Sequence, residues 1–270
     1  MKPNLLCILA LLCISTSSFA VNNLRLSDIR SMGMSGNEVL QSALFNPALI
    51  ALYESKSLIF NYLNRYELKE LGTVNGSFYL PNDFLPAGFN FCSFGYDAYR
   101  ETLFRLALGK QLNKKWTLGV GVQYAFLQTE LFEEQPAQLS TDIGITYSPV
   151  DNLLIGLLIM NLPSVSLQDE PLEIEDFKDY LLQIGFQWEI INNVLISTTL
   201  GSNKVHPLIP AFGLEYTPFD NFSIRGGVGG MPFTPSFGVG YGFSHLRVDV
   251  AAVYHSVLGF STGLGLQFTF

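Results

Sequence analysis

Apolar and polar positions alternate most clearly at the C-terminal end of the chain. Apolar side chains take every second position over 246–255 and again over 259–270, and a short turn at 256–258 separates the two runs. A period of two is that of a β-strand, whose successive side chains point to opposite faces. The other row carries glycines and charges. This pattern is typical of strands with one face toward lipid and the other toward a lumen.

The same alternation recurs from residue 56 onward and predicts an all-β fold of fourteen antiparallel strands. Most span about 9 to 11 residues, the length at which a tilted strand crosses a membrane. Tight turns rich in Asn, Asp and Pro alternate with longer connections, and an even strand number puts both chain termini on the short-turn side. The predicted strands are 56–63, 72–80, 84–94, 102–112, 116–127, 138–148, 153–162, 177–189, 194–202, 207–217, 222–230, 234–243, 246–255 and 259–270.

The composition separates a membrane barrel from a soluble β-protein. Of the 270 residues, 48% are hydrophobic and only 14% are charged, whereas about a quarter of an ordinary soluble domain is charged. Beyond the N-terminus the longest apolar run, 153–162, is too short for a spanning helix, which needs about 20 residues. The 24 glycines and 22 phenylalanines also favour a transmembrane barrel.

The first 55 residues differ from the rest of the chain. Residues 1–20 resemble a cleaved secretory signal peptide, with Lys2, an apolar core and a small residue at Ala20. Residues 21–55 contain glycines and one or two helical turns near 38–44, and Pro47 is expected to end or redirect any helix there. We expect this segment to plug the barrel formed by 56–270; a short amphipathic cap on a sheet is the alternative.

No pattern in the chain supports catalysis, a metal or a cofactor. Gly259 to Gly263 matches the nucleophile-elbow string but starts a strand, whereas that motif needs a strand-to-helix turn. The three histidines lack metal-ligand spacing, and Cys92 is expected to be a buried, inert thiol. The net charge of −8, without a basic cluster, argues against a nucleic-acid partner. The chain is therefore expected not to be an enzyme.

Charged residues at inward positions are a better indication of a site. Strand parity places six of them in the lumen: Arg105, Asp142, Glu215, Arg225, Arg247 and Asp249. Mutual pairing would keep the barrel interior hydrogen-bonded. The functional alternative is a polar constriction or a docking surface for the plug.

The plug carries a motif found in a known superfamily. Residues 31–36 read Ser-Met-Gly-Met-Ser-Gly, and ten residues later come Asn46, Pro47 and Ala48. This resembles the start of the FadL/PorV superfamily, whose members are fourteen-stranded outer-membrane barrels with an N-terminal hatch. The resemblance implies a hatch or ligand-proximal role for Gly33, Gly36, Asn46, Pro47 and Ala48. The chain end, with Gly265, Phe268 and Phe270, looks like the signal read by the barrel-assembly machinery.

The resemblance implies a place in the bacterial outer membrane, in contact with its lipid, and two functions. One is a FadL-like channel for small hydrophobic compounds; the other is a PorV-like accessory role in type IX secretion. A purely structural barrel is a third possibility. The chain is shorter than typical members, which puts fatty-acid capture by large loops in doubt. Connections 129–137 and 163–176 are acidic and suit a basic secretion partner, divalent cations or simply a solvated rim: Glu130, Glu133, Glu134, Asp169, Glu170, Glu173, Glu175 and Asp176.

Overall fold

The computed structural model describes residues 24, 26–130, 135–167, 179–230 and 232–270. The predicted signal peptide and most of the acidic loop residues lie outside this part of the chain. Glu130, at the end of the fifth long strand, is described and exposed.

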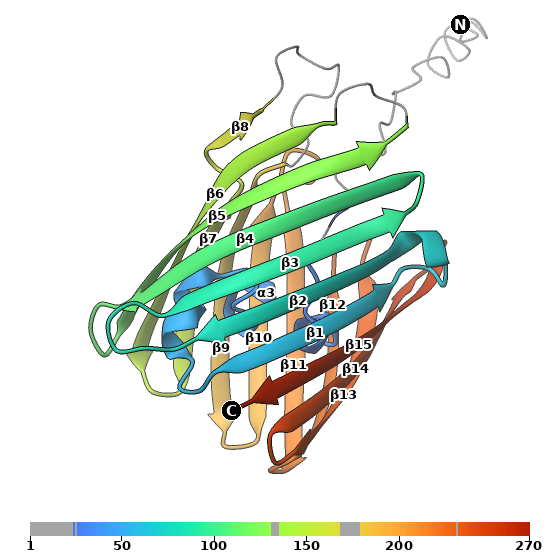
Figure 1. Cartoon of the computed structure of the whole chain (residues 1–270). Helices are drawn as coiled ribbons and strands as arrows, with labels where there is room; N and C mark the ends of the chain where they lie inside the picture. Colours follow the sequence, from blue (N-terminus) through green and yellow to red (C-terminus); the bar gives the residue numbers. More distant parts are fainter. Residues whose placement is uncertain (1–23, 25, 131–134, 168–178, 231) are drawn as a thin grey trace, which may run out of the picture.

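Fourteen long antiparallel strands form a closed barrel, as the alternation predicts, and one short strand, β8, is added to its wall (Figure 1). Closure comes from β1 pairing with β15, where Ser57 lies opposite Thr269. The strands are β1 Ser57–Asn64, β2 Gly72–Leu80, β3 Ala87–Tyr96, β4 Tyr99–Gln111, β5 Trp116–Thr129, β6 Ala137–Val150, β7 Leu153–Met160, β8 Ser164–Ser166, β9 Leu181–Ile191, β10 Val194–Ser202, β11 Ile209–Phe219, β12 Phe222–Gly229, β13 Thr234–Phe243, β14 Leu246–His255 and β15 Gly259–Thr269.

The alternation in sequence becomes an outer and an inner wall. On β5 the apolar side chains of Val120 and Val122 are 47% and 49% exposed, whereas the intervening Gly121 is buried and Gln123 is 1% exposed. Both tryptophans, Trp116 and Trp188, lie on the outer face. The outer wall is therefore the apolar one, as expected for a surface that meets lipid.

The hairpin of β3 and β4 differs from the prediction. Residues 95–101 were expected to be a longer connection, but the strands continue to Tyr96 and from Tyr99, which lie opposite each other. Glu101, which suggests a loop by its charge, points inward, is 0% exposed and accepts a hydrogen bond from the Tyr99 hydroxyl at 2.6 Å. Glu101 can therefore lie within a strand, because its carboxylate is hydrogen-bonded inside the barrel by the Tyr99 hydroxyl and the Leu24 N–H.

The seventh predicted strand, 153–162, is interrupted near its end. β7 stops at Met160, and Asn161 has a φ of +57°, so the chain turns before β8 pairs with β6. The backbone N–H of Asn161 donates to Asp142 Oδ1 at 3.0 Å, and its side-chain Nδ2 donates to the Asp179 carbonyl at 2.7 Å. The strand bends because Asn161 is bonded toward the lumen.

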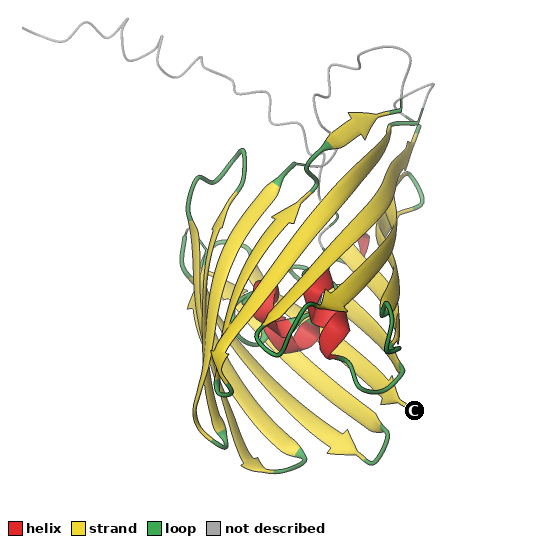
Figure 2. Ribbon diagram, turned by 90° about the vertical axis from the view of Figure 1, so that its left-hand side faces the viewer, coloured by secondary structure: helices red, strands yellow, loops and turns green. Residues whose placement is uncertain are grey.

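Three short helices of the N-terminal segment lie inside the barrel (Figure 2). They are α2 Ile29–Met32, α3 Glu38–Gln41 and η1 Pro47–Leu52; a fourth, η2 Lys69–Leu71, lies in the β1–β2 connection. α2 packs on β13 to β15, α3 on β7, β9 and β10, and η1 on β3 to β6. No helix in the described residues is long and apolar enough to span a membrane. We call residues 24–53 the hatch.

Pro47 begins a helix, contrary to the expectation that it would end one. The preceding helix already stops at Gln41, and Pro47 occupies the first position of η1, where its missing N–H costs no hydrogen bond. Asn46 is the N-cap, since its Oδ1 accepts the Ala48 N–H at 3.0 Å. The Asn-Pro-Ala string is thus a helix start.

Inward glycines act as sockets for the hatch. A Cβ added at Gly119 would overlap the backbone of Pro47 and Ala48, and one added at Gly144 would overlap Asn46 Oδ1. The η1 backbone can lie directly on β5 and β6 because these two positions have no side chain. The inner glycines therefore do not line open space at this level.

Replacing Gly119 with alanine should unseat the hatch without opening the barrel wall. The added methyl group collides with the η1 backbone, which cannot yield as a flexible side chain would. Gly226→Ala is the matched control, because its Cβ would meet nothing closer than Ser236 O at 3.9 Å. Gel mobility of unheated samples reports the barrel, and limited proteolysis reports the hatch. Equal protection of residues 24–53 in both variants would contradict the claim that the η1 backbone packs directly on Gly119.

Candidate functional site

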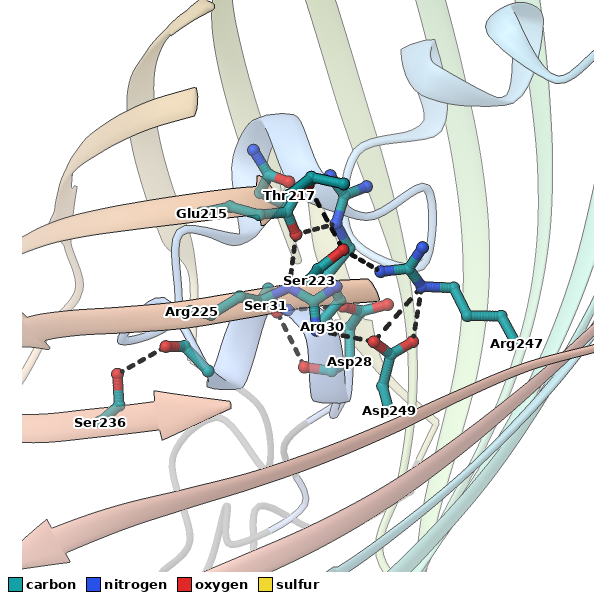
Figure 3. A network of polar contacts seen from close by, with 12 residues as sticks. Asp28, Arg30, Ser31, Glu215, Thr217, Ser223, Arg225, Ser236, Arg247 and Asp249 are labelled. Atoms are coloured by element: carbon teal, nitrogen blue, oxygen red, sulfur yellow. Dashed lines mark hydrogen bonds and ion pairs between the residues drawn. The ribbon is translucent and has the colours of Figure 1, made fainter. Parts of the chain in front are cut away.

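The first contact region between hatch and wall is a charge network at the inner faces of β11, β12 and β14 (Figure 3). Arg30 of the hatch donates Nη2–H to Glu215 Oε1 at 2.7 Å and Nε–H to Glu215 Oε2 at 3.1 Å. Glu215 also accepts from Arg225, which donates to Asp249 Oδ1 at 2.6 Å. Arg247 reaches the other Asp249 oxygen at 3.1 Å. The bidentate pair fixes α2 to the wall with defined geometry.

Asp28 completes this region from the hatch side. It caps α2, accepting the Ser31 N–H at 2.8 Å, and its other oxygen accepts the Ser42 hydroxyl at 3.1 Å. Burial raises the pKa of this carboxyl above its ordinary value, against the lowering effect of the Ser31 hydrogen bond and of Arg30. Asp28 thus links α2 to the chain after α3.

The second contact region is the pair of Arg105 on β4 and Asp142 on β6. Both side chains are 0% exposed, and Nε donates to Asp142 Oδ2 at 2.7 Å. The other guanidinium nitrogens donate to the carbonyls of Leu44 and Phe45 in the hatch, the latter at 2.9 Å. An arginine of the wall therefore holds the backbone between α3 and η1.

A third region, which we call the upper chamber, is a packed cluster of apolar side chains. Beside it lies one buried carboxylate, Glu101, whose Oε2 accepts the Leu24 N–H at 2.8 Å. Inner side chains near the long-connection end of β3, β4, β5 and β7 form one buried cluster with Leu24, Leu26, Leu44 and Phe45 of the hatch. The wall members are Cys92, Phe94, Leu103, Ala125, Leu127, Leu158 and Met160. Interiors of outer-membrane barrels are usually polar. The apolar wall therefore distinguishes this chamber from a water-filled pore.

The opposite end of the barrel, where β1 begins and β15 ends, holds a cavity of about 490 Å³. We call it the base cavity. Asp28 and Arg30 lie on its hatch side, and Ser57 and Asn61 lie on its wall side. Tyr53 also lines it, and burial raises the pKa of this phenol. The base cavity mixes charges with neutral polar groups, unlike the upper chamber.

The structure brings all six predicted lumen residues together in two groups, the Arg105–Asp142 pair and the network of Glu215, Arg225, Arg247 and Asp249. Both proposed roles coexist, because the residues pair with one another and also bind the hatch. Arg30 and Asp28 were not predicted as site residues, since their segment has no periodicity that would assign a direction. Glu101 was missed because it was placed in a connection.

The predicted hatch residues lie inside the barrel. The Gly33 carbonyl accepts the Ser236 hydroxyl at 3.1 Å, Gly36 has a φ of +76° in the turn before α3, and Asn46 donates Nδ2–H to the Val39 carbonyl at 2.8 Å. Pro47 and Ala48 are buried in η1. Contact with a ligand stays a prediction for all five.

The residues predicted to form the assembly signal lie on or next to β15. Gly265 faces inward beside Asn61, whereas Phe270 is 62% exposed. The signalling role of Gly265, Phe268 and Phe270 stays a prediction. Cys92 is buried and is not part of a disulfide. Among the described residues no cluster of three or more His, Cys, Asp or Glu could hold a metal ion.

Comparison with known proteins identifies the fold of this chain. No family model and no curated relative match the chain. The P. putida toluene transporter TodX superposes with a TM-score of 0.66 at 11% identity, covering 89% of this chain and 97% of TodX. A Pseudomonas aeruginosa FadL homologue superposes with a TM-score of 0.64 at 12% identity, covering 93% of this chain and 98% of the homologue. The predicted FadL-like barrel fold is thereby confirmed.

Removing Arg105 should destabilise the barrel and release the hatch. Arg105→Met leaves Asp142 buried without its countercharge, a loss of about 3–5 kcal/mol for a broken buried pair. Urea unfolding in lipid vesicles, followed by tryptophan fluorescence, measures this loss as a lower free energy of unfolding. Arg100→Met on the same strand is the control, because its partner Asp97 is fully exposed and little change is expected. Equal midpoints for the two variants would contradict the assignment.

Proposed function

We propose that this protein is an outer-membrane channel for small hydrophobic compounds, closed at rest by the hatch. The observation that carries the proposal is the upper chamber, because a barrel that only passed ions or sugars would gain nothing from an apolar inner wall. The shared fold with TodX, whose name describes a toluene transporter, supports the same solute class.

Leu24 and Leu26 occupy the place that a solute would take. They are 3% and 5% exposed and belong to the same cluster as the inner wall residues Phe94 and Leu103. A small apolar molecule would replace these side chains at little cost, since apolar contacts are exchanged for apolar contacts. The chain thus fills its own binding chamber when no solute is present.

Passage requires a local rearrangement of the hatch and no bond chemistry. Charged residues of the wall hold the hatch at separate points: Arg105, Glu101 and Glu215. The backbone around Gly33, Gly36 and the Asn46–Pro47 junction lies between or beside these points. We infer that this backbone moves while the contacts hold, which opens a path without expelling the whole segment.

A role in type IX secretion is the alternative. It depends on the acidic connections, most of which lie outside the described residues, and the described Glu130 alone favours no partner. That role predicts co-purification of a large protein through those loops, lost on loop truncation without a change in permeability. A purely structural barrel would show neither uptake nor a partner.

Toluene uptake tests the channel. Cells that carry the chain in their outer membrane should take up radiolabelled toluene faster than cells without it. Leu103→Asn should reduce this uptake severalfold, because a lone amide in the upper chamber disfavours an apolar solute. Ser197→Asn is the control; Ser197 is 1% exposed on the inner wall of β10, outside the apolar cluster.

Deleting residues 24–53 should increase permeability to ions and small sugars, because the lumen loses its filling. No uptake of toluene above background by the intact chain would contradict the proposal. Equal loss in the Leu103 and Ser197 variants would contradict the assigned chamber.

A further inference from the structure

A row of neutral polar side chains, each with at least one unpartnered side-chain atom, lines the inner face of β1, β2 and β3. Asn61 is 5% exposed, and Thr73, Asn75 and Asn90 are each 0% exposed. Within the described part of the chain, no hydrogen-bond partner is found for Asn61 Nδ2, Thr73 Oγ1, both amide atoms of Asn75 or Asn90 Nδ2, whereas Asn90 Oδ1 accepts the Tyr79 hydroxyl at 3.2 Å. Buried amides are almost always bonded, so unpartnered ones call for an explanation. We call these four residues the amide row.

The register makes the row continuous. Asn61 lies directly opposite Asn75, and one strand further Asn75 lies opposite Cys92. Thr73 lies opposite Phe94 in the same pairing. Asn90 is two residues before Cys92 on β3, so its side chain faces the same way. The row therefore crosses three neighbouring strands on one face.

The row extends from the apolar cluster of the upper chamber to the base cavity. Its upper neighbours Cys92 and Phe94 belong to the wall of the upper chamber. At its lower end, Asn61 lines the base cavity. A solute that moved from one space to the other along this wall would meet the apolar cluster, then the amides, then the cavity.

The ionic contacts of the hatch lie away from β1 and β2, but its apolar side chains touch both strands. Its helices pack mainly on β3 to β7, β9, β10 and β13 to β15. Leu49, Ile50 and Tyr53 also cluster with Tyr79 of β2 and Ile59 of β1, and the ring centres of Tyr53 and Tyr79 are 4.7 Å apart.

The hydrogen bonds of the hatch to charged wall residues are with Arg105 and Glu101 on β4 and with Glu215 on β11. Opening a path along β1 and β2 therefore requires only the apolar contacts with these two strands to separate, because none of these charged contacts lies on them.

We propose that the solute path runs along the amide row, and that the preferred solute is a small amphiphile with an apolar body and one neutral hydroxyl or amide group. This rests on the proposed function and adds the solute's polar group. The row itself carries no charge, and Arg105, which lies opposite Asn90, is already paired with Asp142. The row would therefore pair with a hydroxyl as donor or acceptor and gives an ion no free countercharge. The amides stay unpartnered in the closed state and gain partners as the solute passes.

Two probes that differ by one hydroxyl group test this: radiolabelled toluene and benzyl alcohol. In cells that carry the chain, Asn75→Leu should slow benzyl alcohol uptake by about three- to tenfold, the factor that one lost hydrogen bond is worth. Toluene uptake should be unchanged. Asn61→Leu should also slow benzyl alcohol uptake and leave toluene uptake unchanged, and it replaces the Asn75 variant if that variant does not assemble.

Gln183→Met on β9 is the matched control, because Gln183 Oε1 is also buried without a partner but lies away from the row. It should affect neither probe. In addition, Asn75→Leu should raise the urea midpoint, because it removes an unpaired amide, whereas a purely structural amide would lower it on removal. Equal loss of both probes, or no loss of benzyl alcohol uptake, would overturn the path. Absence of toluene uptake by the unmodified chain would instead overturn the proposed function.

Discussion

The closed ring of backbone hydrogen bonds is the constraint on which the rest of the structure depends. In the hydrocarbon core of a membrane no water can satisfy an unpaired N–H or C=O, so a sheet can span it only without edges. The pairing of β1 with β15 removes the last edge. Once the ring is closed, each strand has one face toward lipid and one toward the interior, and the period of two in the sequence follows.

The interior then has to be filled. The inner wall of fourteen strands does not fill the space by itself, and the N-terminal hatch completes it. Glycines at Gly119 and Gly144 let the hatch backbone touch the wall, and guanidinium groups bind it at two places. Buried ion pairs contribute little net stability because desolvation offsets their attraction. Their value here is geometric, since they fix where the hatch sits and leave the wall of β1 and β2 free of charged contacts.

Three chemistries divide the lumen by strand. Toward the long connections the inner face of β3 to β5 is apolar except for the buried Glu101, the inner faces of β11, β12 and β14 carry the charge network, and that of β1 to β3 carries neutral amides. Each follows from which residue types stand at inward parity. A solute that passes would therefore be sorted by its apolar body first and by its polar group afterwards.

Strand parity was sufficient to predict the barrel, the outer apolar wall and the inward direction of residues such as Arg105 and Asp249. It could not predict which charges meet, because Arg30 and Glu215 are 185 positions apart and their contact depends on how the hatch enters the ring. The length of the β3–β4 connection was predicted wrongly, and the break at Asn161 was not predicted, for one common reason. In both, a polar residue that suggests a loop or a continued strand is bonded to a partner inside the barrel.

The central claim is that the chain's own N-terminal segment fills the lumen and must move for transport. A disulfide between the hatch and the wall tests it, with Val39→Cys and Gly185→Cys in a chain otherwise free of cysteine. A Cβ at Gly185 would overlap Val39 Cγ1, so the two new side chains would occupy the same place unless their sulfurs join. The account predicts that the disulfide forms, that toluene uptake stops and that a reducing agent restores it. Failure of the two cysteines to join, or full uptake through the joined form, would contradict it.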